Sequence, residues 1–538
     1  MCDTAVEPPE MRWNGWGDPE RAAELPRAVR ALLPVLLGRV PRPEPAVRLD
    51  AVQVEPSRLS DVDLAALAAV VGGDEVRTDA ASRVRRSGGR STPDLLHRRA
   101  HRQQVTDAVV RPATHDEVAR VLAVAGEQGL AVVPFGGGTS VVGGVTPDAG
   151  RHRAVIALDL ARLSGVVRLD AVSGEAVLLA GTRGPEAERL LAEHDLELGH
   201  YPQSFRYASI GGFAAARSSG QNSAGYGRFD TMVTGLRVAT PTGDLDLGRA
   251  PGSAAGPDLT RLLLGSEGIF GVITEVRVRV HRMPRTRIVE SWTFPDFGTG
   301  ADALRSVVQR GGTPTVIRLS DEAETGVSLA QVGRIGKVLA RGASAVTVFE
   351  GEDAEHRRAR TAELIAAAGG TSTGQGAAEE WARTRFDGPY LRDALLDAGV
   401  FCETLETATT WSNLHRLRAA VTSALKDEFA AAGARSFVMC HISHVYPTGA
   451  SLYFTVLAGI KGDPLQTWDT VKRRVGDAIM SSGGTITHHH AIGRDHAGWL
   501  PEEIGETGIR ILRAVKRELD PHGVMNPNVL IGEEPHRE

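Results

Sequence analysis

Residues 135–144 read FGGGTSVVGG and directly follow an apolar run, LAVVP, at residues 130–134. Because glycine has no Cβ, successive backbone N–H groups can approach an anion closely and form a concave binding site. The stretch therefore predicts a loop that cradles a phosphate or pyrophosphate, although a flexible turn is the simpler interpretation of a glycine run alone. No Lys-Ser/Thr pair follows as in a Walker loop, and no G-x-G-x-x-G motif leads into an amphipathic helix as in a Rossmann fold.

The sequence around this loop predicts a small α/β unit. Hydrophobic periodicity predicts strands at 108–111, 130–134 and 154–158, a hairpin of 166–169 with 176–179, and helices at 118–128 and 185–194. Thr114 and Glu117 have the spacing of an N-terminal capping box. These elements favour small sheets over one long doubly wound sheet.

Two further stretches are rich in glycine and serine. Residues 203–212 read QSFRYASIGG and are followed by ARSSG at 216–220, and residues 265–274 read GSEGIFGVIT. Ordinary connections between elements are shorter and more polar. We expect the three stretches together to wrap one extended ligand with a pyrophosphate at its centre.

The overall composition excludes several classes of protein. A chain of 538 residues is long enough for two or three domains. The net charge of -5 gives no basic field for nucleic acid. Cys2, Cys402 and Cys440 are too few and too scattered for a disulfide framework or a Cys-rich zinc site. Without a signal-peptide pattern or an apolar run of about 18 residues, we expect a cytoplasmic protein, and peripheral membrane contact stays open.

Residues 286 to about 480 predict a second domain with β-α-β units and antiparallel pairing, suited to cap a bound ligand. Strands are expected at 288–294, 315–319, 343–349, 403–409, 436–445 and 451–460, and helices at 301–310, 356–368 and 464–480. The chain closes with residues 484–531, which include a predicted helix at 509–519.

The first hundred residues predict a partly loose helical lead-in, with helical spacing at 26–37 and 59–71. Trp13 and Trp16 are expected to clasp this segment onto the main body. The basic segment 83–99 predicts a surface loop, with a phosphate or anionic-lipid contact as the sharper alternative.

Three adjacent histidines, His488, His489 and His490, are the sharpest feature of the second half. In an extended chain His488 and His490 would share one face and His489 would take the other. A metal site completed by Asp495 or His496, a hydrogen-bonded structural cluster, and proton handling with phosphate binding beside a bound cofactor are all open from the residues alone.

The glycine-bearing motifs, taken in order, resemble the FAD-binding domain of the vanillyl-alcohol-oxidase/p-cresol-methylhydroxylase flavoproteins. The resemblance implies an α+β fold: a helical lead-in at 1–100, a two-subdomain FAD-binding domain at 101–285, a cap at 286–480 with an antiparallel sheet, and a segment at 481–538 that returns to the flavin. The Thr139-Ser140-Val141 sequence offers no His, Cys or Tyr, so we expect non-covalent FAD. The residues implied to line FAD are Pro134, Phe135, Gly136, Gly137, Gly138, Thr139, Ser140, Gln203, Ser204, Ser209, Gly211, Gly212, Arg217, Ser218, Ser219, Glu267, Gly268, Ile269, Gly271, Val272 and Ile273.

Within that superfamily, the chain resembles the alkylglycerone-phosphate synthase family, also called alkyl-dihydroxyacetone-phosphate synthases. The likeness rests on the His triplet followed by Ala-Ile-Gly and on motifs spread over most of the chain, among them WNGWG at 13–17, YLRD at 390–393 and GASLYF at 449–454. It implies exchange of the acyl chain of 1-acyl-dihydroxyacetone phosphate for a fatty alcohol, without net redox. Homodimers are common in the superfamily, so a homodimer is expected.

The same resemblance assigns roles to single residues. Tyr453 and the three histidines match catalytic positions, and Arg392 and Arg318 match substrate-binding arginines. Taken alone, Tyr453 would be expected in a sheet core and Arg392 in a surface ion pair. His441 and the second glycine-bearing stretch depart from the family pattern, which leaves an FAD-linked oxidoreductase of a 2-hydroxy acid or another alcohol as the alternative.

Overall fold

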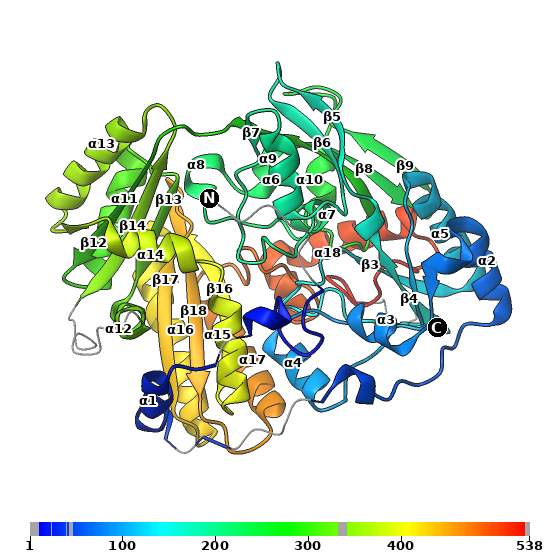
Figure 1. Cartoon of the computed structure of the whole chain (residues 1–538), viewed down its shortest axis with the longest axis horizontal. Coiled ribbons are helices and arrows are strands. Elements are labelled where there is room, and N and C mark those ends of the chain that lie inside the picture. The colour runs from blue at the N-terminus through cyan, green and yellow to red at the C-terminus, as the bar shows by residue number, and fades with distance from the viewer. Residues whose placement is uncertain (1–9, 23, 39, 42–46, 332–341, 533–538) are drawn as a thin grey trace.

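The computed structural model describes residues 10–22, 24–38, 40–41, 47–331 and 342–532. Figure 1 shows two parts side by side: a first lobe, built from residues 76–77, 101–285 and 485–532, and a cap, built from residues 286–484 around one large sheet. The helices and the mostly antiparallel sheets give the predicted α+β class. No helix in the described ranges has the length and apolar content that a membrane span needs.

The first lobe opens with a four-stranded sheet of order β1-β2-β4-β3. Its strands are β1 (Val76–Arg77), β2 (Ala108–Val110), β4 (Ala154–Asp159) and β3 (Leu130–Phe135), and β4 runs parallel to both β2 and β3. Helix α5 (His115–Gln128) joins β2 to β3, and the side chain of Thr114 caps it by accepting the N–H of Glu117 at 3.1 Å. Glu117 in turn accepts the N–H of Ala113 at 2.6 Å, so the predicted capping box forms with a shifted second bond.

A five-stranded antiparallel sheet of order β5-β6-β10-β8-β9 forms the rest of this lobe. Its strands are β5 (Val166–Asp170), β6 (Glu175–Leu179), β10 (Val272–Arg279), β8 (Val233–Thr240) and β9 (Gly243–Leu247), and a small pair joins β7 (Leu196–Glu197) to β11 (His281–Arg282). The helices here are α6 (Gly184–Ala192), α7 (Ile210–Ala215), α8 (Ser223–Tyr226), α9 (Phe229–Met232) and α10 (Leu259–Leu263). The predicted hairpin and the two small sheets are therefore confirmed.

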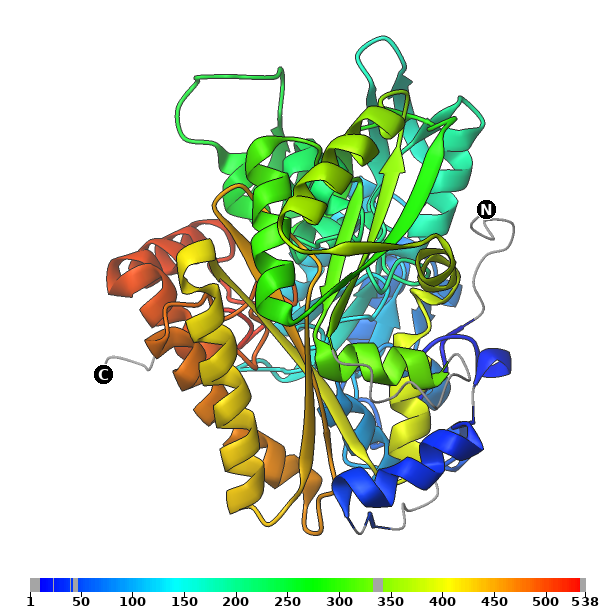
Figure 2. The same ribbon diagram turned by 90° about the vertical axis from the view of Figure 1, so that its left-hand side faces the viewer.

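The cap is a seven-stranded antiparallel sheet of order β15-β12-β14-β13-β17-β18-β16. Its strands are β15 (Thr371–Gly374), β12 (Arg287–Phe294), β14 (Ala343–Glu350), β13 (Val316–Ser320), β17 (Ser436–Ile442), β18 (Gly449–Ala458) and β16 (Phe401–Thr410). The long helices α11 (Phe297–Arg310), α13 (Ala354–Ala367), α16 (Leu414–Ala431) and α17 (Pro464–Ser481) share one hydrophobic core with the sheet. Figure 2 shows α16 and α17 running along the longest strands. The helices α12 (Glu322–Gln331), α14 (Gly376–Thr384) and α15 (Gly388–Asp397) complete the cap.

Alternation along β18 decides which side chains face the first lobe. Leu452, Phe454 and Val456 are fully buried in the core beneath the long helices. Because successive strand residues point to opposite faces, Tyr453 and Thr455 line the cavity between the cap and the first lobe. The strand thus places Tyr453 at the site rather than in the core.

The lead-in does not form a core of its own within its described residues. Helix α1 (Arg27–Leu37) packs on the cap, and α2 (Asp61–Val71) packs on the first lobe. Trp16 packs with Tyr207 and Tyr390, and its backbone N–H bonds to Asp393, which confirms the expected clasp. The expected domain boundaries themselves stay a prediction, and residues 1–9 and 533–538 lie outside the described ranges.

The prediction of a surface loop at residues 83–99 is wrong. The segment contains the end of α3 (Ala80–Arg85) and all of α4 (Thr92–Arg99), and Arg98 is 1% exposed. Its guanidinium bonds to the backbone carbonyls of Trp13, Ser87 and Gly88. The charge pattern alone would predict that water accepts the guanidinium N–H groups of Arg98, but backbone carbonyls accept them instead.

The C-terminal segment returns to the first lobe, as expected. Helix α18 (Leu500–Leu519) contains the predicted helix 509–519 and begins earlier, with a kink at Gly505. Beyond it, Val132 of β3 donates to Val524 at 2.8 Å and accepts the N–H of Asn526 at 2.9 Å. This pairing brings the chain end beside the strand that leads into the first glycine stretch.

Candidate functional site

A cavity of about 1710 Å³ lies between the first lobe and the cap. All three glycine-bearing stretches reach its wall, and the cap contributes residues from its sheet and helices. The predicted residues that line it are Pro134, Gly136, Gly137, Gly138, Thr139, Ser140, Gln203, Ser204, Ser209, Gly211, Gly212, Ser218, Ser219, Glu267, Gly268, Gly271, Ile273, Arg318, Arg392, Tyr453, His489 and His490.

Four residues expected to bind the cofactor do not reach the wall of this cavity. Phe135, Ile269 and Val272 are buried in the first lobe. Arg217 pairs with Asp230 at 2.8 Å and is half exposed. The structure therefore places none of these four at the cavity wall.

The glycine stretches press against one another. A Cβ on Gly137 would lie 2.0 Å from the backbone oxygen of Tyr207 in the second stretch. Asn526 links the first and third stretches, because its side-chain amide donates to Gly144 at 3.0 Å and to the carbonyl of Glu267 at 2.7 Å. A continuous wall of backbone results, which fits the close approach that a dinucleotide pyrophosphate requires.

Glu267 ties the third stretch to the His triplet loop. Its carboxylate accepts the N–H groups of Ile492 at 3.1 Å and of Gly493 at 2.9 Å. Burial raises the pKa of Glu267 to about 7. This residue therefore positions the loop, in addition to lining the cavity.

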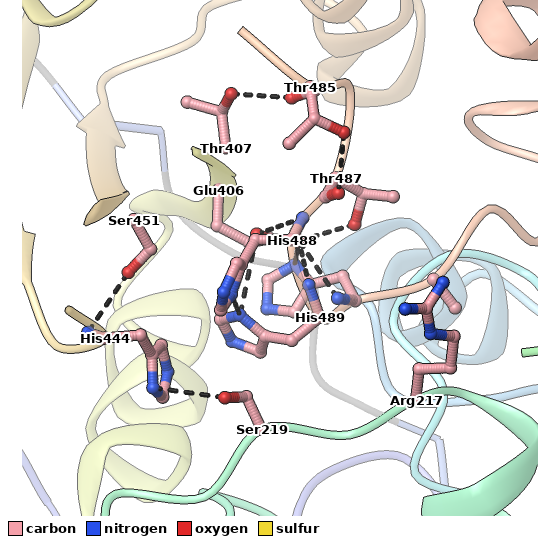
Figure 3. A network of polar contacts seen from close by, with 12 residues as sticks. Arg217, Ser219, Glu406, Thr407, His444, Ser451, Thr485, Thr487, His488 and His489 are labelled. Carbon is pink, nitrogen blue, oxygen red and sulfur yellow. Dashed lines mark hydrogen bonds and ion pairs between the residues drawn. The ribbon is translucent and has the colours of Figure 1, made fainter. Parts of the chain in front are cut away.

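The His triplet folds around a single carboxylate. Glu406, in β16, accepts the backbone N–H groups of His488 at 2.6 Å, His489 at 3.1 Å and His490 at 2.9 Å (Figure 3). Its fourth donor is the hydroxyl of Thr487 at 2.5 Å. Three consecutive N–H groups aimed at one point require a curved backbone, so the triplet is not extended and the alternation of an extended chain does not apply.

Because of this curvature, the three imidazole rings lie in different places relative to the cavity. His489 and His490 line the cavity, whereas His488 lies behind them. Burial lowers the pKa of all three, that of His490 to about 3, so the rings are neutral at pH 7. Burial alone would raise the pKa of Glu406, but the nearby histidines and the bond from Thr487 hold it well below its usual value.

Residues that the sequence did not single out extend the cluster behind the cavity. The hydroxyl of Tyr446 lies 2.6 Å from Nε2 of His488, and Nδ1 of His488 lies 2.9 Å from Nδ1 of His489. His444 stacks on His488 and bonds to Ser219 and Ser223, at 3.1 and 2.7 Å. His444 and Tyr446 follow β17, which ends at Ile442 rather than at residue 445 as predicted.

The same cluster has the ligand types of a metal site. One ring nitrogen from each of His444, His488 and His489 lies within 4.8 Å of the others. Both nitrogens of His488, however, are already engaged by Tyr446 and His489. Asp495 pairs with Lys472 at 2.7 Å and His496 bonds to the carbonyl of Ala491, so neither completes the ligand set considered above. The arrangement favours a hydrogen-bonded histidine cluster.

Tyr453 faces this cluster from the cap. Its ring stacks on His441 at 4.7 Å and lies 6.0 Å from His489, centroid to centroid. Burial raises the pKa of Tyr453 to about 12. The phenol therefore keeps its proton at neutral pH.

The two predicted arginines lie in different surroundings. Arg318 pairs with Glu324 at 2.5 Å and bonds to Nδ1 of His441 at 2.9 Å. Arg392 pairs with the adjacent Asp393 at 3.0 Å and donates to the carbonyl of Arg90 at 2.5 Å. Both side chains line the cavity, and neighbouring residues hold each of them in place there.

Comparison with known proteins agrees with this architecture. Residues 106–246 match the model of an FAD binding domain, and residues 283–530 match that of the C-terminal domain of FAD linked oxidases. The alkyldihydroxyacetonephosphate synthase of Trypanosoma brucei brucei is 30% identical, covering 98% of this chain and 93% of that relative. The Dictyostelium discoideum protein of the same name is 28% identical, with 97% and 93% covered.

A solved structure of an alkyldihydroxyacetonephosphate synthase aligns with a TM-score of 0.83 at 26% identity, and covers 96% of this chain and 98% of its own. FAD is therefore the cofactor, and the first two glycine stretches fall within the matched FAD binding domain. The chain belongs to the alkyldihydroxyacetonephosphate synthase family of FAD-linked enzymes.

Proposed function

We propose that this protein exchanges the acyl chain of a 1-acyl-dihydroxyacetone phosphate for a fatty alcohol, forming the alkyl ether. The observation that carries the proposal is the continuity of the cavity. One wall is the dinucleotide cradle, the next holds Tyr453, His489 and His490, and a further part is strongly apolar.

The apolar part suits a hydrocarbon chain. It is lined by α1, α12, α15 and the strands of the cap, through Val29, Leu33, Leu36, Val327, Leu395, Phe437, Met439 and Leu457. Burying each methylene of a chain in such surroundings contributes about 0.8 kcal/mol. A small 2-hydroxy acid would leave this part of the cavity without use.

Proton handling falls to Tyr453 and His489. When bound, FAD supplies an electron-rich ring beside which a carbon–oxygen bond can be exchanged without net electron transfer. Tyr453, which is protonated at pH 7, can donate a hydrogen bond to the departing carboxylate, which leaves as the anion. Neutral His489, with Nδ1 bonded to His488, leaves Nε2 to accept the proton of the alcohol. His488 and His490 hold and surround that ring, and Arg392 and Arg318 face the anionic end of the substrate.

Non-covalent binding of FAD is part of this proposal, since the first stretch lines the cavity with glycines and with Thr139, Ser140 and Val141, and offers no His, Cys or Tyr there. Acid-precipitated protein should release its yellow colour to the supernatant. Peripheral contact with a membrane is also proposed, because Val35 and Leu36 of α1 are 71% and 38% exposed beside the apolar part. We also expect the protein to be a homodimer in the cytoplasm.

The test is incubation of purified protein with acyl-dihydroxyacetone phosphate and a labelled fatty alcohol. Formation of the labelled alkyl ether, with release of the fatty acid and no consumption of an electron acceptor, is expected. Anaerobic bleaching of the flavin by a 2-hydroxy acid, without ether formation, would instead favour an oxidoreductase.

A further inference from the structure

A buried guanidinium faces the cavity, and no carboxylate of the described residues lies within salt-bridge distance of it. Arg90 is 3% exposed, precedes α4 and lines the cavity. Its Nη1 donates to the carbonyl of the adjacent Gly89 at 2.8 Å, and its Nη2 reaches the carbonyl of Arg12 at 3.4 Å. Its Nε has no hydrogen-bond partner among the described residues.

Other buried arginines nearby are better satisfied. Arg98 donates to three backbone carbonyls, and Arg86 pairs with Asp159 at 2.7 Å. A buried charge without a counterion is costly, and a buried donor without an acceptor adds to that cost. The surroundings of Arg90 therefore point to an anion that enters the cavity.

Arg392 brings a second guanidinium to the same place. It donates to the backbone carbonyl of Arg90, and both side chains line the cavity. Asp393 neutralises one of the two charges, since one of its oxygens pairs with Arg392 and the other accepts the N–H of Trp16. The guanidinium of Arg90 has no direct counterion among the described residues, and Asp94 and Asp393 act on it only from beyond salt-bridge distance.

We propose that Arg90, together with Arg392, binds the phosphate monoester of the ketone substrate; this inference rests on the proposed function. Two guanidiniums can each donate two parallel hydrogen bonds to a phosphate. The backbone N–H of Arg90 donates to the carbonyl of Ser140, in the first glycine stretch, at 2.7 Å. Arg392 belongs to α15 of the cap. A phosphate held by both bridges the two parts, as a substrate between flavin and cap must. The pyrophosphate of FAD is the other possible source of the same chemistry.

The experiment titrates the FAD-loaded full chain with dihydroxyacetone phosphate, dihydroxyacetone or inorganic phosphate in a calorimeter. The variants are Arg90→Gln, which removes the charge, and Arg90→Lys, which keeps the charge but not the fork. Arg99→Gln is the matched control, because Arg99 lies on neighbouring α4, pairs with Asp397 at 2.8 Å and does not line the cavity. FAD content and thermal unfolding are measured for each.

The unaltered protein should bind dihydroxyacetone phosphate at least about tenfold more tightly than dihydroxyacetone. Arg90→Gln should weaken that binding by about tenfold to a hundredfold with FAD retained, Arg90→Lys should lie between, and Arg99→Gln should leave it unchanged. If Arg90→Gln does not fold, the inference is still tested by Arg90→Lys and by comparing the binding of the two ketones to the unaltered protein.

Unchanged binding of dihydroxyacetone phosphate in a folded Arg90 variant would overturn the inference. Loss of FAD, with binding of dihydroxyacetone phosphate intact after reloading, would overturn it in favour of the flavin pyrophosphate. Failure of the proposed function is separate: the unaltered protein would then form no alkyl ether, although its phosphate-ester binding could still depend on Arg90.

Discussion

Glu406, in the cap, accepts the backbone N–H of His490, in the C-terminal segment, at 2.9 Å. The same carboxylate accepts the N–H groups of His488 and His489 and is fully buried. It therefore acts as the template on which the triplet loop takes its shape, and it does so across the boundary between two parts of the chain.

Replacing Glu406 by Gln should destabilise the protein. The amide turns an NH₂ group toward backbone donors that needed an acceptor, and each buried N–H left without one costs about 1–3 kcal/mol. We expect a lower unfolding temperature and loss of ether formation. Glu352→Gln, at an exposed position, is the control and should change neither. An unchanged unfolding temperature in Glu406→Gln would contradict the template role.

Replacing Gly137 by Ala should abolish FAD retention. The added methyl group would lie 2.0 Å from the backbone oxygen of Tyr207, and a backbone atom cannot swing aside as a side-chain end can. Flavin absorbance per mole of purified protein measures the effect. Gly73→Ala is the control, since nothing lies within 4 Å of the place that its methyl group would take. A fully yellow Gly137→Ala protein would show that the second stretch does not press on the first.

Removing the phenol oxygen with Tyr453→Phe should lower the rate of ether formation about 100-fold or more, the range for losing a hydrogen-bond donor to developing negative charge. FAD should remain bound, because the ring still fills the cavity wall. Tyr226→Phe is the control: its hydroxyl bonds to Glu197 at 2.7 Å outside the cavity, so activity should persist. Normal turnover in Tyr453→Phe would remove this residue from the proposed mechanism.

The elements could be predicted from the sequence because local residues set them. The strands around the first glycine stretch and helix α5 depend on contiguous apolar periods and on a cap three residues away, and their bounds agree within a few residues. The three glycine stretches also converge on one cavity, as expected from their composition.

The shape of the triplet loop could not be predicted in this way. It depends on Glu406, 82 residues away from His488, and a glutamate in a strand gives no sign of which N–H groups it accepts. Arg90 was missed for a related reason. The basic residues around it suggested a loop in solvent. Arg98 in the same segment is buried instead, because its guanidinium donates to the carbonyls of Trp13, 85 positions away in the sequence, and of Gly88, 10 positions away.

The buried carboxylate of Glu188 should make stability depend on pH. Burial, with Glu197 nearby, raises the pKa of Glu188 to about 8. Because its pKa is higher in the folded state than in the unfolded state, the folded protein binds more protons between these two values. The contribution of protonated Glu188 to the free energy of unfolding is therefore complete below about pH 4.5 and is lost as pH rises toward 8. The loss is about 1.4 kcal/mol per pH unit within that window.

Glu188→Gln should remove this pH dependence. The free energy of unfolding of the variant, relative to that of the unaltered protein, should therefore increase as pH rises from 5 to 8. Chemical denaturation at a series of pH values measures the difference. Glu193→Gln, exposed on the turn that ends the same helix, should follow the unaltered protein at every pH. A constant difference between Glu188→Gln and the unaltered protein would show that Glu188 ionises normally.

Tyr446 should act on catalysis through two rings. If His489 carries its proton on Nδ1, toward Glu406 at 3.5 Å, it donates to Nδ1 of His488, and Nε2 of His488 then donates to Tyr446. This arrangement keeps Nε2 of His489 free of a proton and ready to accept one. Tyr446→Phe removes the last acceptor, so the opposite tautomer becomes accessible. We expect kcat to fall about tenfold, the worth of one hydrogen bond, with KM for the acyl substrate unchanged. A rise in KM at constant kcat would mean that Tyr446 shapes the substrate site instead.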